Sequence, residues 1–141
     1  THFVATDTST NALNVARRNS RIHRVSKQIR FIKTNELPET KSDHLIIVAN
    51  LPYLDQQKKS YFYKKSPELR YEPKSALFAK QNGLKYYYQL IRQINTIKKK
   101  QVTCFFEIDN HQQSELTRII RNVLDPPKLS YSSGVTSFSL S

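Results

Sequence analysis

The chain has 141 residues, of which 38% are hydrophobic, so it is long enough to fold as one domain around a buried core. Its 23 lysines and arginines against 11 acidic residues give a formal net charge of +12. This balance favours polyanionic partners such as RNA, DNA or a ribosome-associated protein, although a basic surface that serves only solubility fits it as well. The longest apolar run, Leu45 to Ala49, is too short to span a membrane. The lone Cys104 excludes a disulfide within the chain and a cysteine metal site, so we expect a cytoplasmic protein. We also expect a monomer.

The first part of the chain predicts a strand followed by a helix. The apolar run Phe3 to Ala5 predicts a short buried strand that ends at Asp7. The hydroxyl side chains that come next can cap a helix at its N-terminus. The residues expected on the inner face of this helix are Leu13 and Ala16, with Val15 as a further candidate.

Further strands and a long connection follow. Residues 29–32 predict a second strand, and residues 45–49 form an uninterrupted apolar run, which is typical of parallel strands covered on both faces. Residues 55–80 show little periodicity, so we expect a long loop there, which is either functional or disordered. Apolar residues at helical spacing then predict a helix over 83–97, and residues 102–108 predict another strand.

The last part of the chain predicts an amphipathic helix and two closing strands. The apolar positions of the helix lie between Leu116 and Leu124. Residues 129–131 and 135–140 flank a Ser-Ser-Gly turn and predict a β-hairpin. Strands and helices that alternate in this order predict an α/β domain with a mainly parallel sheet and a C-terminal antiparallel hairpin.

Two polar residues, Asp7 and Asn50, follow predicted strands. Ligands of doubly wound sheets bind at the carboxyl ends of the strands. The Asp7 carboxylate is able to accept hydrogen bonds from both hydroxyls of a ribose, and a helix cap or turn residue is the alternative. Asn50 opens the tetrapeptide Asn50-Leu51-Pro52-Tyr53. Pro52 fixes its own φ and holds Leu51 extended, which stiffens the backbone carbonyls at this point.

The tetrapeptide suits methyl transfer to a planar nitrogen. The nitrogen of an amide or an exocyclic amine is a poor nucleophile because its lone pair is delocalised. The Asn50 side-chain carbonyl and a backbone carbonyl can hold such an NH₂ group in line with an electrophilic methyl group, and the Tyr53 ring can pack against the planar acceptor. Catalysis is then achieved by positioning, without a conventional base. An ordinary Asn-Pro turn after a strand is the alternative.

Other candidate sites carry less information. The histidines are scattered without metal-ligand spacing, so no metal site is expected. With two glycines in the whole chain there is no phosphate-binding glycine loop. The aromatic run Tyr61 to Tyr63 is surrounded by lysines, which are Lys58, Lys59, Lys64 and Lys65. This cluster predicts either a clamp for nucleic acid or a lid whose aromatic rings pack on the core.

Four stretches, the tetrapeptide among them, resemble the release-factor glutamine methyltransferases, the HemK/PrmC family. They cover nearly the whole chain in the right order. The third stretch is the most specific to the family, whereas Asn-x-Pro-Tyr is shared with adenine methyltransferases of DNA and RNA. The stretches are Ala5-Thr6-Asp7 with Asn11-Ala12-Leu13 and Ala16-Arg17-Arg18-Asn19; Asn50 to Tyr53; Tyr71-Glu72-Pro73 with Ala76-Leu77-Phe78, Asn82-Gly83-Leu84 and Tyr87; and Phe106-Glu107-Ile108 with Gln112.

The resemblance implies a Rossmann-like class I methyltransferase fold that binds S-adenosylmethionine. Asp7 would hold the ribose of this cofactor, and Asn35 stands where the family has an acidic residue near the adenine. Asn50 would hold the amide of a glutamine in a peptide chain release factor, next to the cofactor, and would act in catalysis together with Pro52 and Tyr53. The residues expected to bind the substrate are Asn50, Leu51, Pro52, Tyr53, Glu72 and Pro73.

The sequence also departs from the family. Leu51 replaces the usual proline, a form more usual in rRNA adenine dimethylases, and Asn35 lacks the usual charge. The family's first strand and glycine-rich cofactor loop would precede Thr1, and so would its N-terminal helical domain. That strand lies between the strands that carry Asp7 and Asn50. We therefore interpret residues 1–141 as a partial catalytic domain, and expect them to be poorly stable, inactive and weak in cofactor binding by themselves.

Three functions remain open from the sequence. The first is methylation of a glutamine amide in a release factor. The second is methylation of an adenine amine in RNA or DNA, which the charge, Leu51 and the basic aromatic cluster favour and the stretch from Glu72 to Gly83 opposes. The third is a degenerate, non-catalytic methyltransferase-like binding module, which Asn35 and the missing glycine-rich loop favour.

Overall fold

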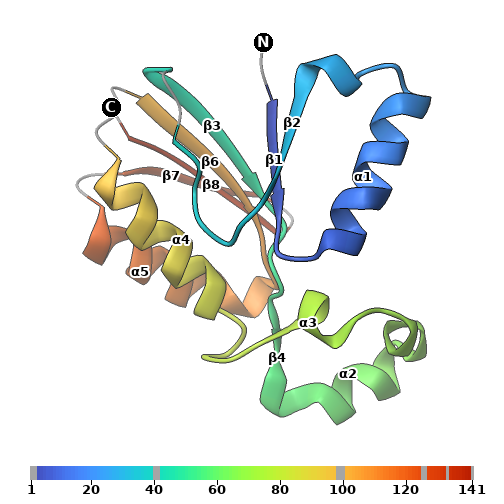
Figure 1. The fold of residues 1–141 in the computed structure, drawn as a ribbon. Coiled ribbons are helices and arrows are strands. Elements are labelled where there is room, and N and C mark those ends of the chain that lie inside the picture. The colour runs from blue at the N-terminus through green and yellow to red at the C-terminus, as the bar shows by residue number, and fades with distance from the viewer. Residues whose placement is uncertain (1–2, 40–41, 98–100, 125–126, 133, 141) are drawn as a thin grey trace. The chain divides into compact units, whose positions relative to one another are not determined.

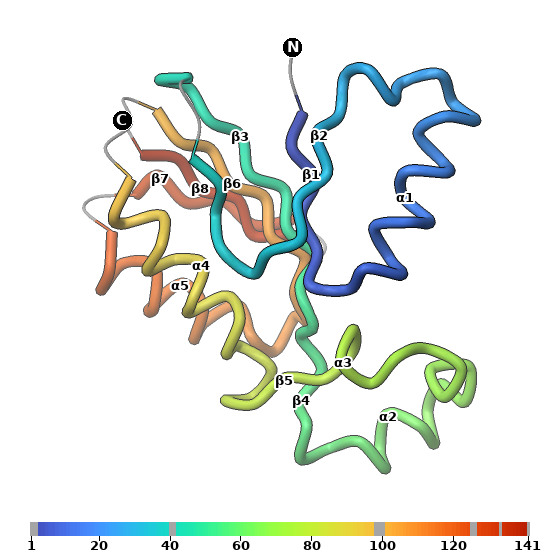
Figure 2. The backbone as a smooth tube through the Cα atoms, in the orientation of Figure 1, coloured from blue at the N-terminus to red at the C-terminus, as the bar shows by residue number. Residues whose placement is uncertain are grey.

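The computed structural model describes residues 3–39, 42–97, 101–124, 127–132 and 134–140. The chain divides into two compact units, an N-terminal unit from Thr1 to Thr40 and a C-terminal unit from Lys41 to Ser141. Each unit is described by itself below. Figure 1 gives the labels of the helices and strands, and Figure 2 shows the path of the backbone.

The N-terminal unit is a β-α-β arrangement. Strand β1 (Phe3–Asp7) leads into helix α1 (Thr10–Ile22), and a short 3-10 helix η1 (Ser26–Gln28) leads into strand β2 (Ile29–Lys33). The two strands are parallel, with Phe3 opposite Ile29 and Asp7 opposite Lys33. The Ser9 side chain accepts a hydrogen bond of 3.2 Å from the backbone N–H of Ala12, which confirms the predicted N-terminal cap.

Two details of the N-terminal prediction are wrong. The first strand is not buried, because Phe3 is 53% and Val4 43% exposed. Strand β1 pairs only with β2 in the described part of the chain, so its apolar residues lack neighbours on the other edge. Val15 is 59% exposed while Leu13 is buried. Two residues span about 200° of helical turn, so these two side chains point to opposite sides of α1.

The C-terminal unit is built on a mixed sheet in which the strands follow the order β3-β6-β8-β7. Strand β3 (His44–Ala49) is parallel to β6 (Gln101–Glu107), and the remaining neighbours are antiparallel. The predicted hairpin is confirmed by β7 (Lys128–Ser132) and β8 (Val135–Leu140), although Ser133 in its turn lies outside the described residues. The α/β class with a C-terminal antiparallel hairpin is therefore confirmed.

Helices α4 (Lys85–Thr96) and α5 (Gln113–Val123) lie on the same side of this sheet (Figure 1). The side chains between the helices and the sheet are fully buried, and they confirm the predicted helical spacing. They include Leu84, Tyr87, Ile91 and Ile94 from the first helix region, and Leu116, Ile120 and Leu124 from the second. Strand β6 supplies Val102, Cys104 and Phe106. Alternate residues of one strand thus form one wall of the core.

The expectation that residues 45–49 are covered on both faces is wrong. Ile47 and Ala49 are buried, but Ile46 is 71% and Val48 79% exposed. Successive side chains of a strand point to opposite faces, and the helices of this unit cover one face only (Figure 1). Strand β3 is also an edge strand, since it pairs with β6 alone in the described residues.

The expectation of an irregular loop over residues 55–80 is wrong as well. The short parallel strands β4 (Leu54–Asp55) and β5 (Phe78–Ala79) close a small lobe, whose path is visible in Figure 2. A helix of four to seven residues is too short to repeat a 3.6-residue pattern, so these residues show no periodic signal. The lobe contains η2 (Gln56–Lys58), α2 (Lys59–Lys65), η3 (Pro67–Tyr71) and α3 (Lys74–Leu77).

Candidate active site

The predicted tetrapeptide lies directly after β3, at the carboxyl end of that strand. Asn50 is exposed, whereas Leu51, Pro52 and Tyr53 are half-buried. Within the described residues, no hydrogen bond engages the Asn50 side chain or the carbonyl groups of Leu51 and Pro52. These oxygens are therefore available to accept hydrogen bonds from a bound substrate.

The phenol of Tyr87 holds the start of this segment. Tyr87 is fully buried on α4, and its hydroxyl accepts a hydrogen bond of 3.1 Å from the backbone N–H of Leu51. The hydroxyl donates to the carbonyl of Glu107 at the end of β6, with the carbonyl of Ala49 3.5 Å away. Burial raises the pKa of this phenol, so it stays protonated. One hydroxyl thus ties the ends of the neighbouring strands β3 and β6 together.

The side chain of Gln112 holds the other end of the segment. It is 1% exposed and lies in the short 3-10 helix η4 (Asn110–Gln112) that precedes α5. Its Nε2 donates to the Tyr53 carbonyl at 2.8 Å and to the Asn82 carbonyl at 2.5 Å. Its Oε1 accepts from the Asp109 N–H at 3.0 Å. Both amide hydrogens are used, so the amide is fully satisfied although it is buried.

A left-handed turn packs against the Tyr53 carbonyl. Gln81, Asn82 and Gly83 have φ values of 57°, 53° and 86° in succession. A Cβ atom at Gly83 would lie 1.9 Å from the Tyr53 carbonyl oxygen and 2.4 Å from Gln112 Nε2. Only glycine fits this position, because both the φ angle and the close approach exclude a side chain. Left-handed conformations of non-glycine residues cost energy and often occur at functional sites.

Three carboxyl groups surround Tyr53. Its hydroxyl donates a hydrogen bond of 3.0 Å to Glu107 Oε1. Burial, together with this hydrogen bond and the nearby charges of Glu107, Asp109 and Glu72, raises the pKa of Tyr53 to about 12. Burial also acts to raise the pKa of Asp109, but the His111 ring 2.7 Å away and the His111 N–H outweigh it, so the pKa of Asp109 is lowered. The phenol is therefore neutral and the nearby Asp109 is ionised near neutral pH.

The structure brings Glu72 to the site but gives Pro73 no comparable contact. Both residues are exposed and lie where η3 passes into α3. Glu72 lies close enough to Tyr53 for its charge to act on the phenol. Pro73 lies directly before α3, at its N-cap position, with a φ of −58°, which is a structural use of proline.

Asp7 and Asn35 lie together in the N-terminal unit. Asp7 is the last residue of β1, and its carbonyl accepts a hydrogen bond of 3.1 Å from Thr34, the neighbour of Asn35. Asp7 Oδ1 accepts from the Ser9 N–H at 2.7 Å, so the carboxylate does serve the turn into α1. Oδ2 has no hydrogen-bond partner among the described residues. The carboxylate therefore fits a hydroxyl-bearing ring such as a ribose, and the two uses predicted for it are compatible.

The described residues contain no candidate metal site, no reactive cysteine and no membrane-spanning helix. No group of three or more histidine, cysteine or acidic side chains gathers there in a way that suits a metal ion. Cys104 is fully buried, and burial raises the pKa of its thiol to about 12. No described helix is long and apolar enough to cross a bilayer.

Sequence reasoning gave no role to Tyr87, Gly83, Glu107 and Gln112. All four occur in the stretches that resemble the methyltransferase family, but their contacts to the tetrapeptide span between 30 and 59 positions of the chain. The one local signal was Gly83, one of two glycines in the chain, at the first residue of a predicted helix.

Comparison with solved structures identifies the fold. The chain is similar to the catalytic domain of hMettl16 in complex with the MAT2A 3′UTR hairpin 1, with a TM-score of 0.71 at 14% identity, over 99% of this chain and 55% of that one. It is also similar to a ribosomal protein L11 methylase from Lactobacillus delbrueckii subsp. bulgaricus, with a TM-score of 0.55 at 16% identity, over 99% and 57% of the two chains. The fold is thus that of class I methyltransferase domains.

Comparison with curated sequences is more specific. The chain is 34% identical over 119 residues to a release factor glutamine methyltransferase of Enterococcus faecalis, covering 83% of this chain and 41% of that protein. It is 31% identical over 132 residues to the enzyme of the same name from Staphylococcus aureus, covering 91% and 46%. A bifunctional methyltransferase of Rickettsia prowazekii is 31% identical over 125 residues, covering 86% and 23%. The chain therefore spans less than half of these relatives. No protein-family model matches it.

Proposed function

We propose that this chain provides the acceptor site of an S-adenosylmethionine-dependent methyltransferase that acts on the side-chain amide of a glutamine in a peptide chain release factor. The observation that carries the proposal is the Asn50 amide, which is exposed and unbonded within the described residues, on a backbone braced by Tyr87 and Gln112. The curated relatives named above support the choice of acceptor.

The geometry supports catalysis by positioning. One N–H of the substrate amide donates to Asn50 Oδ1, and the other donates to the Leu51 carbonyl. Pro52 restricts the backbone, and the buried Tyr87 hydroxyl fixes the Leu51 N–H, so neither acceptor has to be ordered during the reaction. With both N–H bonds held, the nitrogen is fixed in one orientation. This arrangement compensates for the weak nucleophilicity of an amide.

Tyr53 contributes a neutral ring rather than a base. With a pKa of about 12 its phenol keeps its proton near neutral pH, and its hydrogen bond to Glu107 fixes the ring orientation. The ring face then packs on the planar amide. No base is needed before methylation, because the acceptor loses its proton to solvent only after the new bond has formed.

Two residues of the N-terminal unit are the candidates for holding the cofactor. The free Oδ2 of Asp7 would accept hydrogen bonds from the ribose hydroxyls, and Asn35 would lie on the adenine side. When bound, S-adenosylmethionine supplies an electrophilic methyl group that the acceptor nitrogen takes as the carbon–sulfur bond breaks.

Methylation of an adenine amine is the second candidate. The adenine amino group has the same planar NH₂ geometry, and Leu51 at the second position of the tetrapeptide favours it. The carboxyl groups of Glu72, Glu107 and Asp109 around Tyr53 oppose it, because carboxylates repel the phosphates that accompany an adenine in a nucleic acid. The same groups tolerate a neutral glutamine side chain. This difference supports the protein acceptor.

Methyl transfer with labelled S-adenosylmethionine tests the proposal. The protein that carries this chain is incubated with a release factor or with RNA, and the methylated product is mapped by mass spectrometry. We expect label on one glutamine of the release factor, and a loss of at least about 100-fold for Asn50→Ala, since positioning effects of this size are common. Asn122→Ala, an exposed asparagine on α5, is the matched control and keeps activity.

Two results contradict the proposal. Label in RNA only assigns the adenine reaction instead. Full activity of Asn50→Ala removes the acceptor role of the tetrapeptide and favours a degenerate binding module.

A further inference from the structure

The lobe, taken from Leu54 to Lys80, carries a concentration of positive charge. Its acidic residues are the buried Asp55 and the exposed Glu68 and Glu72. Its basic residues are Lys58, Lys59, Lys64, Lys65, Arg70, Lys74 and Lys80. In the described part of the chain, none of these cations has a carboxylate within ion-pair distance. The lobe therefore presents charge that no internal partner neutralises.

The inner face of α2 accounts for part of the aromatic cluster. The rings of Phe62 and Tyr63 lie 6.3 Å and 5.4 Å from the ring of the buried Phe78, measured between centroids. The Lys59 ammonium lies 5.3 Å from the Phe78 centroid. These contacts form the small core of the lobe. Phe62 and Tyr63 thus pack their rings inside the lobe and are not free to contact a ligand.

The outer face of α2 has a different composition. Tyr61 and Lys65 are spaced at i and i+4 in α2, which places them on one side of the helix, and Lys58 ends η2 directly before α2. All three are exposed, and Tyr61 is 58% exposed. This part of the lobe thus carries an exposed aromatic ring, with an exposed cation before it and another after it in the chain.

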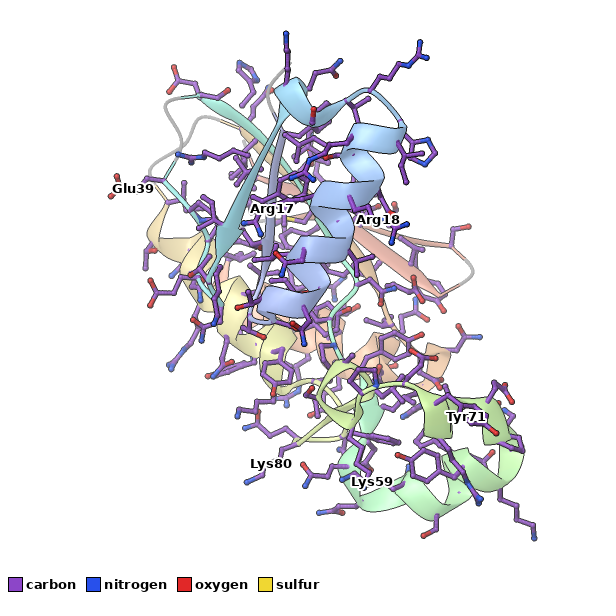
Figure 3. All side chains as sticks on the ribbon, turned by 45° about the vertical axis from the view of Figure 1, so that its right-hand side comes forward. Arg17, Arg18, Glu39, Lys59, Tyr71 and Lys80 are labelled. Atoms are coloured by element: carbon purple, nitrogen blue, oxygen red, sulfur yellow. The ribbon has the colours of Figure 1, made fainter. Side chains whose placement is uncertain are left out.

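A second exposed ring lies at the end of η3. Tyr71 is 93% exposed, although a tyrosine ring normally covers apolar surface. The guanidinium carbon of the neighbouring Arg70 lies 5.9 Å from the centroid of the Tyr63 ring. Arg70 thus contacts a ring of the lobe, whereas the Tyr71 ring lies in solvent. Figure 3 shows Tyr71 at one end of the lobe and Lys80 at the other, with Lys59 between them. The lobe therefore carries two exposed rings together with several exposed cations.

We propose that the outer surface of this lobe, built from Lys58, Tyr61, Lys65 and Tyr71, binds single-stranded nucleic acid. Proteins that hold single strands combine cations along the phosphate backbone with aromatic rings on which the bases stack. An acidic protein would use the cations but would leave two exposed tyrosine rings without a partner. The combination of rings and cations favours a nucleic acid. The inference does not depend on which nitrogen the active site methylates.

The lobe is joined directly to the candidate active site, because its strand β4 begins at the residue after Tyr53 of the tetrapeptide.

Binding of fluorescein-labelled 12-nucleotide RNA and DNA of one sequence, followed by anisotropy without cofactor, tests the proposal. We expect the association constant to fall as the salt concentration rises. In a plot of its logarithm against the logarithm of the salt concentration, the double variant Lys58→Gln with Lys65→Gln should have a slope that is shallower by about 0.7 for each lost phosphate contact. Tyr71→Ala should weaken binding at least about fivefold, whereas Tyr71→Phe, which keeps the ring, should bind normally. Binding to either strand supports the proposal, and the tighter one identifies the natural ligand.

The control variant removes the same charge elsewhere. Arg18→Gln with Arg121→Gln neutralises exposed arginines on α1 and α5, and should leave the affinity nearly unchanged. An equal loss in this control would assign the binding to net charge alone and overturn the proposal. Equally tight binding of a poly-glutamate peptide would overturn it too, because the rings would then have no role. Asn50→Ala should bind normally, which separates this inference from the proposed reaction.

Discussion

Replacing Gln112 with leucine removes a buried amide and keeps a side chain of similar length. In the structure this amide serves the carbonyls of Tyr53 and Asn82 and the N–H of Asp109. After the substitution these three backbone groups face an apolar side chain. A polar group left unsatisfied in the interior costs about 1–3 kcal/mol, and groups near the surface recover part of this from water. We therefore expect Gln112→Leu to lower the free energy of unfolding by about 2–5 kcal/mol.

A comparison of three variants separates the amide from the packing. Gln112→Glu keeps the oxygen that accepts from Asp109 but places a second oxygen against the two carbonyls. Only the protonated carboxyl group can donate a hydrogen bond to these carbonyls. The pKa of this carboxyl group is therefore higher in the folded protein than in the unfolded chain. The stability of Gln112→Glu should then be highest at acid pH and fall as the pH rises through the folded pKa. Gln113→Leu, at a half-buried neighbour, is the control and should differ little from the wild type.

Urea unfolding and hydrogen exchange measure the two parts of this prediction. The unfolding midpoint reports the global loss. Exchange of the backbone amides of Leu51 and Tyr53 reports whether the tetrapeptide has become mobile, and it should accelerate in Gln112→Leu relative to the amides of α5. An unfolding free energy within about 0.5 kcal/mol of the wild type, with unchanged exchange over residues 51–54, would refute the bracing role of Gln112. That result would stand whatever the methylation assay shows.

Three further predictions follow from the same region and from the sheet edges. Gly83→Ala should be destabilised more than Gln112→Leu in urea unfolding, because the added Cβ would lie 1.9 Å from the Tyr53 carbonyl oxygen at a φ of 86°; a neutral result would mean that the turn can relax. The raised pKa of Tyr53 gives stability that is complete below pH 10 and lost between pH 10 and about 12, and Tyr53→Phe should remove this loss in unfolding measured across that range. Because β1 and β3 are each paired on one edge only in the described residues, we expect residues 1–141 alone to bind S-adenosylmethionine weakly; tight binding in calorimetry would contradict this.

Local patterns in the sequence were sufficient for most of the fold. The spacing of apolar residues predicted α4 and α5, and the structure buries the same side chains. The turn at Gly134 predicted the β7–β8 hairpin. These predictions succeeded because a helix or hairpin that buries one face must repeat apolar residues at its own period. The candidate acceptor residue Asn50 was also visible, since it follows a strong strand and precedes a proline.

The errors came from features that depend on neighbours distant in the sequence. An apolar run predicts a strand, but whether one face or both are covered depends on which helices pack there, and for β3 Ile46 and Val48 remain exposed. The helices of the lobe are too short to show a repeat of apolar residues at helical spacing. Their arrangement around Phe78 follows from the packing of aromatic rings.

The sequence by itself determined the α/β class, the order of the helices and strands outside residues 54–80, and a tetrapeptide suited to hold a planar NH₂ group. The tertiary structure alone decided how that tetrapeptide is held. Gln112, Gly83 and Tyr87 contact it from positions at least 30 residues away in sequence, and each contact depends on the relative placement of β3, β6, α4 and α5. Hydrogen bonds between backbone carbonyls and distant side chains leave no periodic trace in a sequence, because any single residue of the right type can make them. Only the packed structure selects which one does.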